Sequence, residues 1–128
     1  MAEAPPRRKR ILVAEDDPAI GTILKKVLAK EYDVTIVNDG HSAVVAAAAQ
    51  PPPDLLLLDV MMPGLDGIAV AAQVRTIPTL KSVPIIFLTA KGGPSDVIRG
   101  IQHGARHYIT KPFKIDDVLA KVKKALGK

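Results

Sequence analysis

The sequence predicts an α/β domain with a five-stranded parallel sheet and helices on both of its faces, a doubly wound architecture. Three observations support this fold class. Short apolar segments alternate with segments of helical periodicity, five times along 128 residues. One apolar segment, Leu55–Leu58, contains no polar residue, as expected for a strand that is covered on both faces. The length is sufficient for one domain with a substantial core.

The first strand–helix unit begins after a basic N-terminal segment. Ile11–Ala14 is the first candidate strand. Asp17-Pro18 is typical of a helix start, because Asp caps the amino end and Pro fits the first helical position. We therefore favour a capping role for Asp17 over a metal-ligand role. The helix follows from apolar residues at helical spacing: Ile20, Ile23, Leu24, Val27 and Leu28.

The second unit combines a β-branched segment with an alanine-rich one. Val34–Val37 predicts the second strand. Asp39-Gly40 indicates a turn, and Ser42–Gln50 indicates a helix. The prolines at 51–53 end that helix, since proline cannot continue it.

The third and fourth units place a polar loop after a buried strand. Leu55–Leu58 is the third strand, and the loop Asp59–Asp66 leads to a helix over Ile68–Val74, so that Asp66 and Gly67 mark a loop and helix start. Pro84–Leu88 predicts the fourth strand, and a Gly-Gly-Pro turn at 92–94 precedes a short helix over 95–102.

The fifth unit closes the domain. His107–Ile109 predicts a short strand near an edge of the sheet. The last helix carries an apolar stripe on one side and lysines on the other; its apolar positions are Ile115, Val118, Leu119, Val122 and Leu126.

Composition excludes several classes of protein. The chain has no cysteine, so disulfides and thiolate metal sites are excluded. It has neither a signal-peptide pattern nor an apolar run long enough to span a bilayer, which leads us to expect a cytoplasmic protein. The net charge of +5 comes partly from Arg7–Arg10 and partly from lysines near the C-terminus. With two Tyr, two Phe and no Trp, binding of nucleic acid is not expected.

Chemically useful residues follow the predicted strands. Glu15 and Asp16 follow the first strand, Asp59 the third, Thr89 the fourth and Lys111 the fifth. In open parallel sheets ligands bind beyond the carboxyl ends of the strands, so these side chains should meet at one edge.

The types of residue at this edge favour phosphoryl transfer to a carboxylate. Clustered carboxylates require a proton or a cation between them, and Mg2+ accepts oxygen ligands while keeping several waters. Because cysteine, a phosphate-binding glycine loop and a nucleophile elbow are absent, a carboxylate remains as the nucleophile. Asp59 is the best candidate because it follows an apolar strand and opens a Gly/Pro-rich loop. Lys111 and Thr89 can stabilise the phosphoryl oxygens.

Four stretches in order and at matching spacing carry a specific resemblance: ILVAEDD at 11–17, LLLLDVMMPGLDG at 55–67, PIIFLTA at 84–90 and HYITKPF at 107–113. With them, the chain resembles a receiver domain of bacterial two-component response regulators, from about Arg10 to Leu126. The resemblance implies a flavodoxin-like strand order of 2-1-3-4-5, with residues 1–9 as a basic tail and 10–128 as the receiver domain. It also implies a signalling domain rather than an enzyme, either alone or as part of a longer regulator.

The resemblance implies a role for each residue of the site. Asp59 would take the phosphoryl group from a sensor histidine kinase or a phosphotransfer protein. Asp16 and Asp59 would bind Mg2+, with Glu15 assisting through water and the backbone carbonyl of Met61 as a further ligand. A methionine at position 61 would also shield the acyl phosphate, so we expect slow autodephosphorylation.

The resemblance also implies how a signal leaves the site. Thr89 would move toward the phosphoryl group, and the ring of Tyr108 would turn inward. Lys111 would pair with Asp59 and then with phosphate, and the Lys111-Pro112 bond would be cis. The output face would consist of the fourth helix, fifth strand and last helix. Arg99, Arg106-His107 and the final lysines make this face basic, which predicts an acidic output partner.

Three alternatives remain open. A pseudo-receiver would bind partners without phosphorylation, although the acid, Thr and Lys set is complete. A metal-dependent phosphatase with an Asp nucleophile usually needs a second acid two residues further on, where this chain has Met61. Nucleic-acid binding through the basic tail and the last helix lacks a supporting helix-turn-helix or zinc motif.

Overall fold

The five strands form one parallel sheet in the order β2-β1-β3-β4-β5. The computed structural model describes residues 8–90 and 105–127. In this part of the chain the strands are β1 (Arg10–Ala14), β2 (Asp33–Val37), β3 (Leu55–Asp59), β4 (Ile85–Ala90) and β5 (Ala105–Lys111). The predicted fold class and strand order are confirmed.

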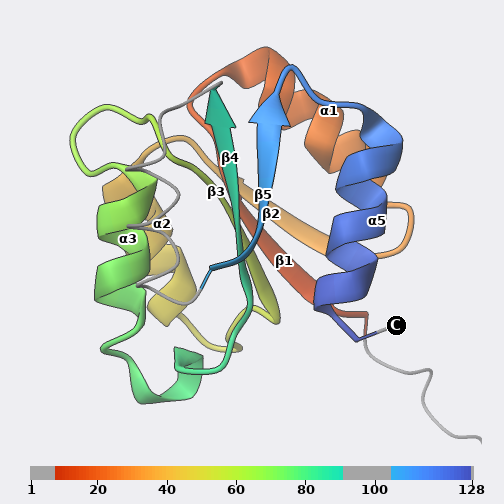
Figure 1. Cartoon of the computed structure of the whole chain (residues 1–128). Helices are drawn as coiled ribbons and strands as arrows, with labels where there is room; N and C mark the ends of the chain where they lie inside the picture. Colours follow the sequence, from red (N-terminus) through yellow and green to blue (C-terminus); the bar gives the residue numbers. More distant parts are fainter. Residues whose placement is uncertain (1–7, 91–104, 128) are drawn as a thin grey trace, which may run out of the picture.

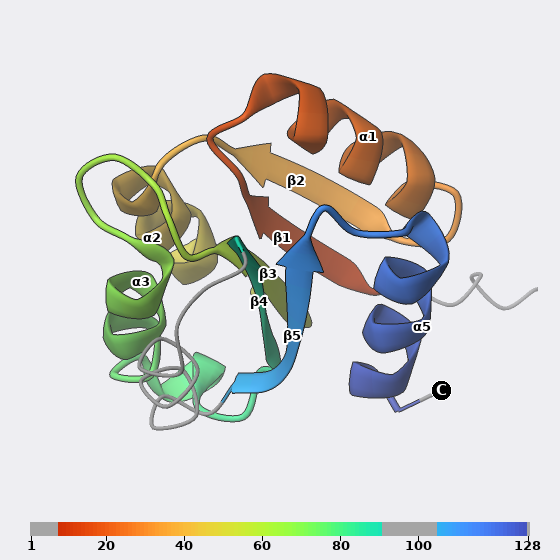
Figure 2. The ribbon, with the colours of Figure 1, turned by 45° about the horizontal axis from the view of Figure 1, so that its top comes forward.

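Helices cover both faces of this sheet. The helices are α1 (Pro18–Leu28), α2 (Gly40–Ala48), α3 (Gly67–Val74) and α5 (Ile115–Ala125), with a 3-10 turn η1 (Pro78–Leu80) that the sequence did not indicate. Figure 1 and Figure 2 show α1 and α5 on one face and α2 and α3 on the other. The helix expected over 95–102 lies outside the described residues. Within the described part of the chain, no helix is long or apolar enough to cross a membrane.

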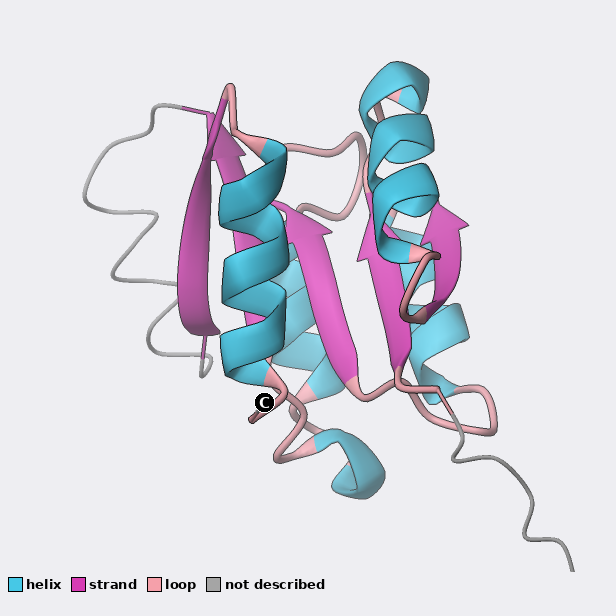
Figure 3. Ribbon diagram, turned by 90° about the vertical axis from the view of Figure 1, so that its right-hand side faces the viewer, coloured by secondary structure: helices cyan, strands magenta, loops and turns pink. Residues whose placement is uncertain are grey.

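Strand β3 runs through the middle of the core. Its four leucines are fully buried, which confirms that this strand is covered on both faces. Side chains alternate along a strand, so Leu56 and Leu58 pack with α2 and α3, whereas Leu55 and Leu57 pack with α1 and α5. Figure 1 shows the sheet edge-on between the two layers of helices, and Figure 3 looks onto the face that α1 and α5 cover. Because β3 is packed on both faces, its carboxyl end has a fixed position at the edge of the sheet where the strands end, at the top of Figure 1.

Aspartates begin three of the helices. Asp17 accepts a hydrogen bond from the Ala19 backbone N–H at 2.9 Å, which confirms its predicted capping role. Asp39 accepts from Ser42 N at 2.8 Å, so α2 begins at Gly40, earlier than predicted. The Asp39-Gly40 pair is thus a helix start rather than a separate turn, because the Asp side chain satisfies the first free N–H groups. Asp66 caps α3 in the same way.

Strand β5 is longer than predicted. It lies at the edge of the sheet, as expected, but extends to Lys111, which pairs with Ala90 of β4. The prediction of a short strand followed by Lys111 was therefore wrong. The added residues are held by backbone pairing with β4, which the side-chain pattern alone does not reveal.

Candidate functional site

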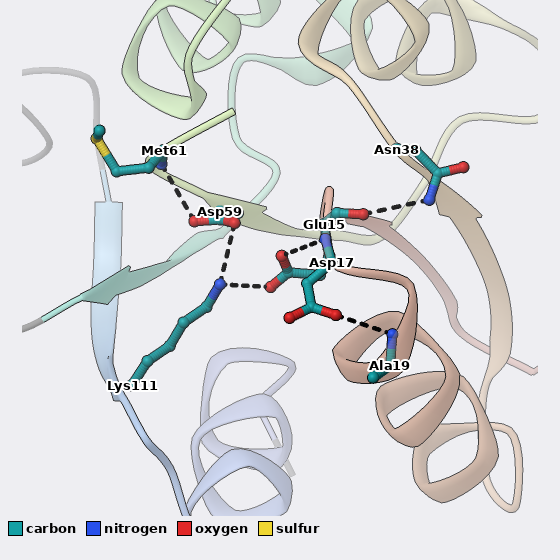
Figure 4. Close-up of polar contacts among 7 residues, drawn as sticks. All are labelled: Glu15, Asp17, Ala19, Asn38, Asp59, Met61 and Lys111. Carbon is teal, nitrogen blue, oxygen red and sulfur yellow. Dashed lines mark hydrogen bonds and ion pairs between the residues drawn. The ribbon is translucent and has the colours of Figure 1, made fainter. Parts of the chain in front are cut away.

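Three strands bring charged side chains together at one edge of the sheet. Glu15 directly follows β1, Asp59 is the last residue of β3, and Lys111 is the last residue of β5. Because all strands are parallel, these ends meet at the same edge. Figure 4 shows the Lys111 side chain reaching from β5 to both carboxylates.

Lys111 bridges the two buried carboxylates. Its Nζ lies 3.0 Å from Asp59 Oδ2 and 2.7 Å from Glu15 Oε1. Asp59 is 2% exposed and Glu15 is fully buried. The backbone N–H of Met61 donates to the other Asp59 oxygen, Oδ1, at 3.1 Å. Both oxygens of Asp59 thus have a partner, which fixes the orientation of the carboxylate. The Lys111-Pro112 peptide bond is cis, as the resemblance implied.

The charges at this site are not balanced. Burial raises the pKa of Asp59, and Glu15 raises it further, while Lys111 offsets these effects only in part. For Lys111, burial acts to lower the pKa, but the neighbouring Glu15 and Asp59 raise it above its ordinary value. One ammonium group therefore faces two buried carboxylates, and the site can accept additional positive charge.

A cluster of carboxylates fits a divalent cation. Glu15, Asp16 and Asp59 can each place a carboxylate oxygen within 4.8 Å of the others. The Glu15 Oε1 atom is buried and forms an ion pair with the Lys111 ammonium, but it accepts no hydrogen bond from the described residues. An all-oxygen set with one exposed member, Asp16, suits Mg2+, which retains several waters. Asp17 is not part of this cluster.

Backbone contacts hold Glu15 in place. Its N–H donates to the Val37 carbonyl at 3.0 Å, and its own carbonyl accepts from Asn38 Nδ2 at 3.3 Å. The Glu15 carboxylate oxygen Oε2 accepts from the Asp17 N–H at 3.1 Å. Asn38 was not identified from the sequence. A polar residue directly after a strand is a signal for such a role, but its partner depends on the pairing of β1 with β2.

Gly67 allows the loop after Asp59 to fold back. A Cβ atom at Gly67 would lie 2.3 Å from the Asp59 carbonyl oxygen, closer than real contacts allow. The Gly67 N–H donates to the Val60 carbonyl at 3.0 Å. Sequence reasoning treated Gly67 only as a helix start, whereas the structure places it against the backbone of the candidate nucleophile.

Thr89 and Tyr108 lie on the two neighbouring strands β4 and β5. Thr89 is 9% exposed and pairs in register with Thr110. The ring of Tyr108, which is half-buried, lies 5.8 Å from that of Phe87, between centroids. Thr89 follows Leu88, whose carbonyl accepts from the Val60 N–H at 2.9 Å, so it lies at the same edge as Asp59. Their switching role remains a prediction.

Nearly the whole chain matches one known family of domains. Residues 11–123 match the model of the response regulator receiver domain. The chain belongs to this family. Its members are domains of two-component systems, so the resemblance drawn from the four sequence stretches is confirmed.

Relatives of this receiver domain include longer regulators. It is 42% identical over 120 residues to the DNA-binding response regulator MtrA of Mycolicibacterium smegmatis, covering 93% of this chain and 51% of that protein. It is 41% identical over 115 residues to the transcriptional regulatory protein TcrA of Mycobacterium tuberculosis, covering 89% of this chain and 44% of that protein. The receiver domain spans about half the length of these relatives.

Solved structures of receiver domains have the same architecture. The receiver domain of sensor histidine kinase PA1611 from Pseudomonas aeruginosa, with a magnesium ion coordinated in its active site cleft, gives a TM-score of 0.85 at 34% identity and covers 94% of this chain and 99% of that one. The chemotaxis protein CheY4 of Vibrio cholerae gives a TM-score of 0.87 at 26% identity, covering 92% of this chain and 98% of that one.

Proposed function

We propose that this receiver domain is a phosphorylation-dependent switch in which Asp59 accepts a phosphoryl group from a phosphohistidine on a kinase or phosphotransfer protein. The observation that carries the proposal is the contact of Lys111 with both Asp59 and Glu15 at the carboxyl edge of the sheet. It combines an oriented carboxylate, a nearby cation and a carboxylate cluster that fits Mg2+.

The proposed transfer is an in-line displacement at phosphorus. A carboxylate oxygen of Asp59 forms the new O–P bond, the N–P bond of the phosphohistidine breaks, and the leaving imidazole nitrogen keeps the electron pair and takes up a proton. Mg2+ held by Glu15, Asp16 and Asp59, with the Met61 carbonyl as a further ligand, would neutralise charge on the phosphoryl oxygens. Lys111 would then pair with a phosphoryl oxygen, and the Thr89 hydroxyl would donate to another.

The phosphodonor has an apolar surface to approach beside Lys111. A cavity of about 330 Å³ opens between α1 and the segment after β5; Ile20, Ile23, Lys111, Pro112, Phe113 and Ile115 line it. Ile23 is 47% exposed although it is apolar. Such a surface suits the apolar side of a partner helix that presents its phosphohistidine to Asp59.

The output would pass through Thr89 and Tyr108 to the face formed by β5, α5 and the expected helix over 95–102. Lys91 and Met61 would flank the phosphoryl group. Both Lys91 and Arg99 lie outside the described residues. Met61 is 68% exposed and its backbone N–H contacts Asp59, and we propose that its side chain slows hydrolysis of the acyl phosphate. An acidic partner on this face, in the same chain or in a separate protein, would read the change.

Incubation with acetyl phosphate tests the proposal. With Mg2+ present, intact mass should show one added phosphate in the wild-type protein and none in Asp59→Asn, which keeps the shape of the side chain. Asp17→Asn is the matched control, since Asp17 caps α1 and lies outside the carboxylate cluster. An unmodified wild type would support a pseudo-receiver. Continuous release of phosphate with many turnovers would instead support a phosphatase.

A further inference from the structure

Among the described residues, most acidic side chains lie at the site edge of the sheet and many exposed basic side chains lie at the opposite edge. Strands run toward the site and helices run away from it, so helix carboxyl ends lie at the opposite edge (Figure 1). Acidic residues gather at the site edge: Glu15, Asp16, Asp17, Asp39, Asp59, Asp66, Asp116 and Asp117. Exposed basic residues gather around the start of β1 and the carboxyl ends of α1 and α5: Arg8, Lys9, Lys25, Lys26, Lys30, Lys123 and Lys124. We name this second group the basic end.

Arg8 joins the N-terminal segment to α1. Its guanidinium donates to the Ala29 carbonyl at 3.1 Å and to the Lys30 carbonyl at 2.5 Å. The Lys9 carbonyl accepts from Asp33 N–H at 2.9 Å. These bonds hold Arg8 and Lys9 beside the last turn of α1, which contains Lys25 and Lys26. The cations of the N-terminal segment thus add to those of the helix.

The last turn of α5 lies on the same face of the sheet. Figure 2 shows α1 and α5 covering one face of the sheet. Their inner sides share one apolar cluster, which includes Leu28 and Val122. Lys123 and Lys124 belong to the last turn of α5 and are exposed. The basic end therefore draws its cations from three segments of the chain that lie at the same edge of the sheet.

Few acidic side chains offset this charge. The nearby acids are Glu31, Asp33 and Asp54. Asp33 pairs with Arg10 at 3.4 Å, and Asp54 accepts from the Arg10 N–H at 2.8 Å, so both are engaged by that residue. Within the described ranges, no residue of the basic end forms an ion pair with another described residue. The cations are therefore available to an external anion.

The basic end has no large apolar side chain to anchor a protein or a bilayer. The exposed large apolar residues of the described chain are Ile23, Val45 and Met61, and none belongs to the basic end. Protein interfaces have an apolar core, and stable attachment to a bilayer usually adds apolar insertion or a lipid chain. The phosphate backbone of duplex DNA instead requires only well-spaced cations.

We propose that the basic end binds the phosphate backbone of duplex DNA without sequence preference. The sequence analysis argued against nucleic-acid binding because the chain has few aromatic residues for stacking on single strands and no known binding motif. Contact with the phosphate backbone of a duplex needs neither feature. The basic end lies at the edge opposite Asp59, so DNA and the phosphoryl group do not compete for the same atoms. The proposal is independent of the phosphorylation proposed above.

Fluorescence anisotropy of a short labelled DNA duplex of arbitrary sequence tests this proposal across a series of salt concentrations. The observed affinity should fall steeply with salt, because each phosphate contact releases counterions. Lys26→Gln/Lys30→Gln should reduce the logarithmic salt slope by about 2, one for each lost phosphate contact. The matched control Lys81→Gln/Lys114→Gln removes the same charge outside the basic end and should keep the slope.

Two competitors separate DNA from other anionic partners. Polyglutamate at equal charge concentration should displace the duplex poorly, and vesicles containing phosphatidylserine should bind less tightly than DNA. Equal slopes for both double variants, absence of salt-dependent binding, or stronger binding of polyglutamate or vesicles would overturn the proposal. Circular dichroism of all variants identifies any loss of folding, and in that case Lys26→Gln and Lys30→Gln are measured singly.

Discussion

The ammonium group of Lys111 lies 3.0 Å from Oδ2 of Asp59, although the two residues are 52 positions apart in the chain. It also lies 2.7 Å from Glu15, so one cation holds two carboxylates that would otherwise repel each other. This contact exists because β1, β3 and β5 end at the same edge of the sheet. The stability of the metal-free protein should therefore depend on the charges at the site.

Replacement of Lys111 by methionine should destabilise the protein at neutral pH. The substitution leaves Glu15 and Asp59 buried without their cation, and we expect a loss of about 1–3 kcal/mol in the free energy of unfolding. Urea denaturation without Mg2+ measures it. Lys114→Met, at the exposed start of α5, should change the free energy by less than about 0.5 kcal/mol. Equal effects of the two substitutions would contradict this prediction.

Replacement of Glu15 by glutamine should separate stability from metal binding. Removal of one carboxylate relieves repulsion with Asp59, so metal-free stability should stay level or increase. Mg2+ at 100 times its dissociation constant should stabilise the wild-type protein by about 2.7 kcal/mol, because it binds only the folded state. This gain should be largely lost in the variant. Thermal unfolding with and without Mg2+ measures both effects, and a full Mg2+ response in Glu15→Gln would refute the assignment.

The contribution of Asp59 to the stability of the metal-free protein should decrease as pH rises through the titration range of this residue. Its folded pKa lies above the ordinary value of 3.8, so the folded state binds its proton more tightly than the unfolded state. The contribution is therefore favourable at low pH and is lost as pH rises from the unfolded to the folded pKa. The Asp59→Asn variant has no carboxyl group to titrate at this position. The free energy of unfolding of the variant minus that of the wild type should therefore increase over that pH range. Denaturation at a series of pH values measures this difference, which would stay constant if Asp59 had an ordinary pKa.

An alanine at position 67 should disturb the loop that carries Asp59. The new Cβ would lie 2.3 Å from the Asp59 carbonyl oxygen, so the backbone must shift. We expect a loss of stability of about 1–3 kcal/mol, as for overpacked sites, together with slower phosphorylation by acetyl phosphate. Gly21→Ala is the control, because its Cβ would meet Ile36 at an ordinary 3.5 Å within a helix. A Gly67→Ala protein with normal stability and phosphorylation would show that this contact has no effect.

Most of the architecture could be predicted from local pattern. The apolar segments located all five strands, and Asp17-Pro18 located the start of α1, because these signals depend on side-chain spacing and backbone preference. The errors concerned where an element begins or ends, which backbone pairing decides in one case and a side-chain cap in the other. Strand β5 extends to Lys111 through its pairing with β4, and α2 begins at Gly40 through the bonds of Asp39 with Ser42.

The sequence by itself determined which residues could carry chemistry, since acids, a threonine and a lysine follow predicted strands and parallel strands end together. Only the tertiary structure decided how these groups meet. It placed Lys111 between Glu15 and Asp59, made Asn38 a support for Glu15, and brought Gly67 against the Asp59 backbone. Apart from the contact of Gly67 with Asp59, these contacts join residues distant in the chain. Their distances depend on strand pairing and core packing, which no local pattern encodes.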